Sequence, residues 1–205
     1  DSQHIDVRGG WHDASDYLQY VTTTATAVYQ LALAYTMRPE VFSDAFDARG
    51  DSGPNGIPDV LDQVKWGLDW LDRMNPEPGI LFHQIADDRD HMGFRIPGND
   101  TFYSKGYERP VYFCSGQPQG IGKYRNRSTG KASIAGKFAS SFALGSIVLK
   151  NYYPKFSARI LQKAKDAYHT GLEYPGVCQT APCRAPYFYE EENWTDDMEL
   201  AASTL

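Results

Sequence analysis

The sequence predicts an all-α fold in which antiparallel helical hairpins are joined by long loops. Apolar residues recur every three or four positions in five segments of the 205-residue chain, as they do on the buried face of a helix. Segments with the character of strands are few and short, and the long loops fall at one end of the hairpins. Hairpins of this kind build either a solenoid or an α/α toroid, a closed ring of helical hairpins.

Local signals define where the five helices start and stop. The first covers residues 14–37, ahead of Arg38-Pro39, and the second starts at Pro58-Asp59, where proline and an acidic residue suit the first turn. Trp66 and Trp70 follow its apolar stripe, so we expect both in the core. The remaining helices are expected over residues 133–151, over 154–173 and from 195 onward. Residues 80–130 show no helical period, and we expect strands there only at 80–83 and 109–113.

The composition excludes several classes of partner. Lys and Arg total 20 and Asp and Glu total 26, which gives a formal net charge of −6. An acidic chain is poorly suited to nucleic acid or to anionic lipid, since both require a basic face. No apolar run approaches the roughly 20 residues of a membrane-spanning helix. The opening residues, Asp1-Ser2-Gln3-His4, do not resemble a signal peptide, so we expect that a targeting segment was removed or that the sequence starts partway through a longer one.

Three cysteines leave one unpaired if a disulfide forms. Cys178 and Cys183 flank a short loop sequence, and we expect them to pair in an oxidising compartment while Cys114 stays free. Free thiols rank second. A zinc site ranks last, because no histidine lies beside these cysteines to complete it.

The segment most indicative of chemistry is Arg8-Gly9-Gly10-Trp11-His12-Asp13-Ala14-Ser15-Asp16-Tyr17. Asp13 and Asp16 are three residues apart, so at the start of a helix they would share one face near its positive end. Two ionised carboxylates placed together are suited to holding a water molecule and accepting its proton. The alternative is structural: an N-cap aspartate followed by a first-turn aspartate is a common arrangement.

This segment resembles the Gly-Gly-Trp-aromatic-Asp-Ala-Gly-Asp signature of glycoside hydrolase family 9, which includes many cellulases. Two further segments resemble that family in the same order. Residues 55–62, Asn-Gly-Ile-Pro-Asp-Val-Leu-Asp, and the Trp66-Gly67-Leu68-Asp69-Trp70-Leu71 helix are similar to one family segment. Residues 193–202 are similar to its later Asp-Glu-x-x-Trp-Ala-Ala helix. Two departures are Ser15 in place of glycine and Leu200 in place of tryptophan.

The resemblance implies an (α/α)6 barrel that hydrolyses β-1,4-glucosidic bonds with inversion. Asp16 falls on the family's general base and Asp13 on the aspartate that helps to hold the water. Inversion also requires a second carboxyl group about 6.5–9.5 Å away that protonates the leaving oxygen. The family's acid is a late glutamate, and no segment matches its motif. We therefore expect residues 1–205 to be the N-terminal portion of one catalytic domain, about half of the barrel, with the acid outside the sequence.

Five residues are candidates for sugar binding. His91 and Phe94 resemble residues that line the family's sugar cleft, and Arg109 follows the same loop. Trp11 and Trp194 are aromatic side chains that could stack on a sugar ring, in a chain that is 14% aromatic. No cofactor is expected to be required, although Asp87, Asp88 and Asp90 form an alternative calcium site because calcium prefers clustered oxygen ligands.

The leading hypothesis is thus a secreted, periplasmic or cell-surface endo-β-1,4-glucanase that acts on β-glucan polysaccharides or oligosaccharides. An exo-acting β-glucosidase or glucosaminidase of the same family is the first alternative. A non-catalytic carbohydrate-binding protein on the same fold is the second, because the acid is absent from these residues. Further domains, or the rest of the catalytic domain, are expected outside the sequence.

Overall fold

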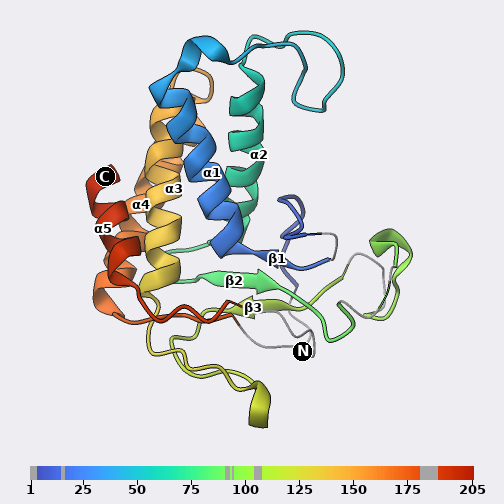
Figure 1. Ribbon diagram of the computed structural model, residues 1–205, viewed down its shortest axis with the longest axis vertical. Coiled ribbons are helices and arrows are strands. Elements are labelled where there is room, and N and C mark those ends of the chain that lie inside the picture. Colours follow the sequence, from blue (N-terminus) through green and yellow to red (C-terminus); the bar gives the residue numbers. More distant parts are fainter. Residues whose placement is uncertain (1–3, 15–16, 91–92, 94, 104–107, 181–188) are drawn as a thin grey trace.

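In the part of the chain that the structure describes, five helices stand on one side of a small sheet (Figure 1). The computed structural model describes residues 4–14, 17–90, 93, 95–103, 108–180 and 189–205. The helices are α1 (Val21–Met37), α2 (Asp59–Met74), α3 (Ala132–Leu149), α4 (Pro154–Glu173) and α5 (Thr195–Thr204). The strands are β1 (Gln19–Tyr20), β2 (Phe82–Ile85) and β3 (Val111–Phe113), and short 3-10 turns cover Pro39–Val41, Pro97–Asn99 and Gly122–Tyr124.

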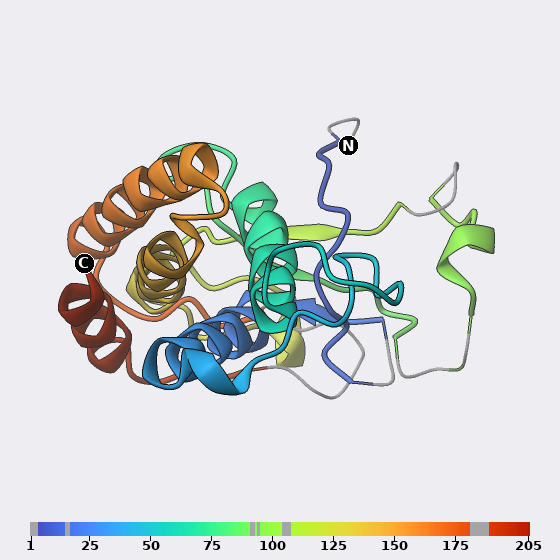
Figure 2. The ribbon, with the colours of Figure 1, turned by 90° about the horizontal axis from the view of Figure 1, so that it is seen from above.

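Helix α3 is the centre of the bundle. It packs against all four other helices, and seen from above they surround it (Figure 2). Its residues are mostly alanine, serine, glycine and large apolar side chains, which allow close approach on every side. The helix is apolar and long enough to cross a membrane, with a mean hydropathy of 1.4, but 83% of it is buried inside the molecule. Burial of this extent is typical of a core helix.

The helices alternate in direction. α1, α3 and α5 begin beside the sheet and run away from it, whereas α2 and α4 return toward it (Figure 1). α1 and α2 pack as one hairpin, and α3 and α4 as the next. Pro154 opens α4 at a position where the missing N–H costs nothing. This is the predicted arrangement of helical hairpins, and it brings the N-termini of α1, α3 and α5 to the same end of the molecule.

The sheet is antiparallel, with the strands in the order β1-β2-β3. Gln19 lies opposite Ile85 and Tyr20 opposite Gln84, while a bulge interrupts the register between β2 and β3. β2 and β3 overlap the two strands expected from the sequence. β1 was not predicted, because its two residues become a strand only by pairing with residues 64 and 66 positions away.

The start of α1 differs from the prediction. The sequence places it at residue 14, but α1 begins at Val21, after extended residues in β1. The backbone N–H of Asp13 instead donates to the carbonyl of Leu18 (2.8 Å). The segment bounded by these two residues, of which 13, 14, 17 and 18 are described, is called the turn at residues 13–18. Asp13 therefore lies eight positions before the helix, and the argument from a helix dipole does not apply to it.

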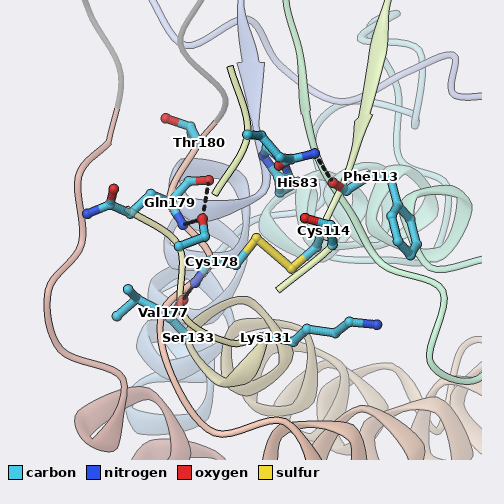
Figure 3. Close-up of a disulfide and its surroundings, with 12 residues drawn as sticks. His83, Phe113, Cys114, Lys131, Ser133, Val177, Cys178, Gln179 and Thr180 are labelled. Carbon is cyan, nitrogen blue, oxygen red and sulfur yellow. Dashed lines mark hydrogen bonds between the residues drawn. A yellow bond between two sulfur atoms is a disulfide. The ribbon is translucent and has the colours of Figure 1, made fainter. Parts of the chain in front are cut away.

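The disulfide also differs from the prediction. Cys114, at the end of β3, is bonded to Cys178, in the segment after α4 (Figure 3). Their Cα atoms are 6.2 Å apart, within the normal range for a disulfide. The expected Cys178–Cys183 pair is therefore wrong, because Cys178 already has a partner 64 residues away. Both bonded cysteines are buried.

Candidate active site

The glycine-rich segment at residues 7–10 is fixed by one face of α2. Three side chains spaced along that face donate hydrogen bonds to main-chain carbonyl groups of the segment. They are Trp70 to Val7 (3.1 Å), Arg73 to Arg8 (2.5 Å) and Trp66 to Gly10 (3.0 Å). The amide of Gln19 donates to the fourth carbonyl, that of Gly9 (2.8 Å). Four consecutive carbonyl groups thus have side-chain partners, which sets the path of the chain into Asp13.

The two tryptophans of α2 have different surroundings. Trp70 is fully buried, as the sequence predicts, but Trp66 is 47% exposed. The expectation that Trp66 belongs to the core is therefore wrong. Its indole N–H is used to hold Gly10, and its ring covers the outside of the glycine-rich segment. An apolar stripe identifies the buried face of a helix, but it does not distinguish a core tryptophan from one at the edge of that face.

Asp13 is held by a tyrosine from the far end of the chain. The hydroxyl of Tyr189 lies 3.2 and 3.1 Å from the two carboxylate oxygens of Asp13 and donates to them. The ring of Tyr189 packs edge-on against the buried ring of Tyr20, with centroids 4.9 Å apart. A carboxylate has about four acceptor positions, so Asp13 retains the capacity to accept a hydrogen bond from water.

A network of three arginines and three aspartates lies beside this turn. Arg89 binds Asp87 and Asp100, and Arg95 binds Asp90 and Asp100. Arg109 binds Asp90 through Nη2 (2.6 Å) and donates through Nη1 to the carbonyl of Tyr17. With equal numbers of each charge, the six side chains neutralise one another within the loop that joins β2 to β3.

Burial and ion pairing act in opposite directions on this network. Burial alone would raise the pKa of Asp87, but the hydrogen bonds from Arg89 outweigh it and lower the pKa of that carboxyl. Hydrogen bonds from Arg89 also lower the pKa of Asp100. Burial lowers the pKa of Arg109, although an arginine remains charged at neutral pH. The lowered pKa values of Asp87 and Asp100 keep both carboxyl groups ionised at neutral pH.

The alternative calcium site gains no support from this geometry. Asp87 and Asp90 each form ion pairs with arginine, whereas Asp88 is exposed. Within the described ranges, no group of three or more histidine, cysteine, aspartate or glutamate side chains is placed to hold a metal. A calcium ion at this loop would have to compete with the arginines that already neutralise Asp87 and Asp90.

Of the other candidate residues, the structure describes Trp11 and Trp194. Trp11 is half-buried, and its ring packs closely on Gly67 of α2, where an added Cβ would lie 2.7 Å from it. Trp194 is half-buried at the N-terminal cap of α5. Asp16, His91 and Phe94 lie outside the described residues, so their predicted roles stay predictions, as do those of Trp11 and Trp194.

Two contacts of the turn at residues 13–18 were not predicted from the sequence. Neither Tyr189 nor Arg95 is among the site residues expected from the sequence. The backbone N–H of Arg95 donates to the hydroxyl of Tyr17 (3.1 Å). Neither residue carries a local signal, because each meets its partner across more than 70 residues of chain.

Curated relatives match nearly the whole chain. It is 25% identical over 206 residues to Endoglucanase 5 of Arabidopsis thaliana, covering 100% of this chain and 29% of the relative. It is 30% identical over 176 residues to a cellodextrinase of Butyrivibrio fibrisolvens, covering 85% of this chain and 28% of the relative. The chain therefore spans about a third or less of the length of these relatives.

Solved structures show the same arrangement of helices. The structure of a metagenome-derived glycoside hydrolase family 9 endoglucanase matches with a TM-score of 0.72 and 26% identity, covering 99% of this chain and 33% of that one. The helical hairpins described above are thus part of an (α/α)6 barrel, as the sequence predicts. The family model described as "Glycosyl hydrolase family 9" matches residues 1–205 in full. The chain belongs to glycosyl hydrolase family 9.

Proposed function

We propose that the protein of which these residues form part hydrolyses β-1,4-glucosidic bonds in β-glucans with inversion. The observation that carries this proposal is the turn at residues 13–18. This turn contains Asp13 and Asp16, the two aspartates that match the family's motif. It follows residues 7–10, whose carbonyl groups accept hydrogen bonds from four side chains. Its carboxylate at Asp13 is oriented by Tyr189. A fixed carboxylate that can still accept a hydrogen bond is what positioning of a water molecule requires.

In the proposed mechanism, Asp16 removes a proton from that water as it attacks the anomeric carbon, and Asp13 orients the water. A general acid then protonates the leaving oxygen. We propose that this acid is a glutamate outside the 205 residues, since they span about a third of the length of the relatives. Trp11, His91, Phe94 and Trp194 are proposed to contact sugar residues, two of them through flat indole rings.

We propose that the protein acts in an oxidising location outside the cytoplasm: secreted, periplasmic or at the cell surface. The Cys114–Cys178 bond supports this, because disulfides persist mainly in oxidising compartments. The proposed partner is therefore an extracellular β-glucan, with further parts of the same protein completing the barrel.

The test is reducing-sugar release from barley β-glucan and carboxymethyl cellulose by the full-length protein and its Asp16→Asn variant. Asparagine keeps the size of the side chain but cannot accept the proton, so kcat should fall by at least about a hundredfold. Binding of cello-oligosaccharides should survive. Asp51→Asn is the matched control, because Asp51 is an exposed residue in the loop between α1 and α2.

Each other outcome points to a different conclusion. Near-normal turnover by Asp16→Asn would show that another group is the base. Binding without cleavage by the unmodified protein would favour a carbohydrate-binding role. If cleavage occurs, a ladder of oligosaccharides indicates endo action, whereas a single monomer indicates the exo-acting alternative. The anomer released first, read by NMR, tests inversion directly.

A further inference from the structure

The side chain of Arg109 connects the arginine–aspartate network to the turn that carries the aspartates. Its Nη1 donates to the main-chain carbonyl of Tyr17, and its Nη2 lies 2.6 Å from Oδ2 of Asp90. Tyr17 is the residue that directly follows Asp16, and its neighbour Leu18 accepts the hydrogen bond that closes the turn from Asp13. One guanidinium group therefore bridges a fixed carboxylate and the main chain of the turn.

Asp90, the carboxylate at one end of this bridge, is itself held in place by several partners. Its side chain is fully buried and bound on the other side by Nη2 of Arg95 (2.7 Å). Its Oδ2 also accepts the backbone N–H of Asp87 (2.9 Å). A buried carboxylate with two arginine partners and one main-chain donor has little freedom to move, because movement would break hydrogen bonds to a desolvated charge.

Arg95 holds the same tyrosine from a second direction. Its backbone N–H donates to the hydroxyl of Tyr17 (3.1 Å), and its guanidinium group lies 5.2 Å from the centre of the Tyr17 ring. Tyr17 is thus held at its carbonyl by Arg109 and at its hydroxyl and ring by Arg95. Asp90 binds both arginines. The contacts at the carbonyl and at the hydroxyl of Tyr17 are therefore anchored by the same carboxylate.

The geometry does not suit Arg109 to direct contact with sugar. Its side chain is 13% exposed, and its Nε is shielded from solvent. Two of its nitrogens already bind protein acceptors. A substrate-binding arginine needs donors that reach solvent, so the burial and partners of Arg109 favour a structural connection to the turn over the sugar contact expected from the sequence.

We propose that Arg109, anchored by Asp90, is a positioning residue that fixes the turn at residues 13–18 in the geometry needed for water activation. The expected effect of Arg109 on turnover rests on the proposed function, whereas its expected effect on the structure of the turn does not. Arg109 acts through the main chain of Tyr17 and touches no reacting atom. Its loss should therefore lower turnover while leaving the binding of substrate nearly unchanged, because displacements of about 1 Å in a catalytic group can cost about a hundredfold in rate.

The experiment compares Arg109→Lys with Arg89→Lys in the full-length protein. Lysine keeps the positive charge beside the buried aspartate, but a single ammonium group cannot span two acceptors as the guanidinium fork does. Arg89 belongs to the same network and binds Asp87 and Asp100, with no contact to Tyr17 among the described residues. Arg89→Lys is therefore the matched control.

Arg109→Lys should lower kcat on soluble β-glucan by about ten- to a hundredfold, with KM changed by less than about twofold. Arg89→Lys should change neither by more than about twofold. Addition of ethylguanidine to an Arg109→Ala variant should restore part of the lost kcat. A rise in KM at constant kcat would overturn the proposal and return Arg109 to a sugar-binding role, and wild-type kinetics in Arg109→Lys would overturn it outright.

Hydrogen–deuterium exchange tests the structural step independently of activity. Peptides that cover residues 11–20 should exchange faster in Arg109→Lys than in Arg89→Lys or the unmodified protein, because the turn loses its anchor. Equal exchange in all three proteins would overturn the proposal. If Arg109→Lys does not fold, Arg95→Lys tests the same anchor, since it keeps the main-chain bond to Tyr17 and removes the guanidinium from Asp90. If the unmodified protein cleaves no glucan, the proposed function fails while the exchange result still decides the anchoring role.

Discussion

Gly10 occupies a position where only glycine satisfies both the backbone and the packing. Its φ is +71°, in the left-handed region, and an added Cβ would lie 2.6 Å from the ring of Trp70. Gly10→Ala therefore adds strain of about 1–2 kcal/mol from the backbone. It also adds about 1–3 kcal/mol from overpacking. We expect the free energy of unfolding, measured in urea, to fall by about 2–5 kcal/mol in total, with a loss of activity as the segment leaves α2.

Gly50 is the matched control for this substitution. Its φ is +84°, yet no atom lies within 4 Å of an added Cβ. Gly50→Ala should therefore cost only the backbone part, about 1–2 kcal/mol, and leave activity intact. Equal losses in the two variants would show that the close contact with Trp70 adds nothing at Gly10.

Single residues also show what the sequence could predict about the site. The aspartates and the glycines before them were predicted as a functional segment, because their types and spacing are local. The side chains that hold that segment were not. Trp66 was expected in the core, and Tyr189 reaches Asp13 from 176 residues away. Such contacts depend on how distant segments fold together, and no local pattern records them.

At the scale of elements, prediction succeeded where the determining interactions are local. The expected second, third, fourth and fifth helices agree with α2 to α5 to within a residue or two, because apolar periodicity and proline signals lie within each helix. The first helix was started seven residues early. Leu18 and Val21 continue the apolar stripe on either side of Gln19 and Tyr20, but pairing with β2 draws Gln19 and Tyr20 into an extended conformation.

The contact between α3 and α5 contains a partly buried ion triad that should make stability depend on pH. Lys137 of α3 binds Asp197 of α5 (2.7 Å) and Glu191 (2.5 Å), so one ammonium group serves two carboxylates. Burial raises the pKa of Asp197 to about 6, with Lys137 opposing this and Glu191 and Asp196 adding to it. The folded state thus binds a proton more tightly than the unfolded state, so stability from this group is present below about pH 4 and is lost as pH rises through about 6.

Asp197→Asn should remove this pH dependence. A pKa difference of this size corresponds to at most about 3 kcal/mol. The free energy of unfolding of the unmodified protein relative to the variant should therefore fall, by an amount up to that value, between about pH 4 and about pH 7. Glu199→Gln, at an exposed position of α5 that does not contribute to the pKa of Asp197, should keep the wild-type dependence. A constant difference between wild type and Asp197→Asn across this range would mean that Asp197 does not titrate there.

The whole molecule brings together four segments that are distant in sequence to build one site. α2 holds residues 7–10, the loop between β2 and β3 holds Tyr17, and Tyr189 ahead of α5 holds Asp13. The predicted ring of hairpins accounts for why these segments can meet, since the N-termini of α1, α3 and α5 share one end (Figure 1). The predicted ring does not identify which side chains make contact, because these contacts depend on three-dimensional packing and produce no periodic pattern in the sequence.

The Cys114–Cys178 bond is the covalent connection across this assembly, joining β3 to the segment that leads from α4 toward α5. A bond that closes a loop of 64 residues restricts the unfolded chain and should contribute about 4 kcal/mol to stability. The double variant Cys114→Ala, Cys178→Ala should therefore unfold at much lower urea concentration, whereas Cys183→Ala should unfold like the unmodified protein. Peptide mapping without reducing agent should recover Cys114 linked to Cys178. Recovery of Cys178 linked to Cys183, or a loss of stability in Cys183→Ala as large as in the double variant, would instead establish a local disulfide and leave the ends of β3 and α4 joined by packing alone.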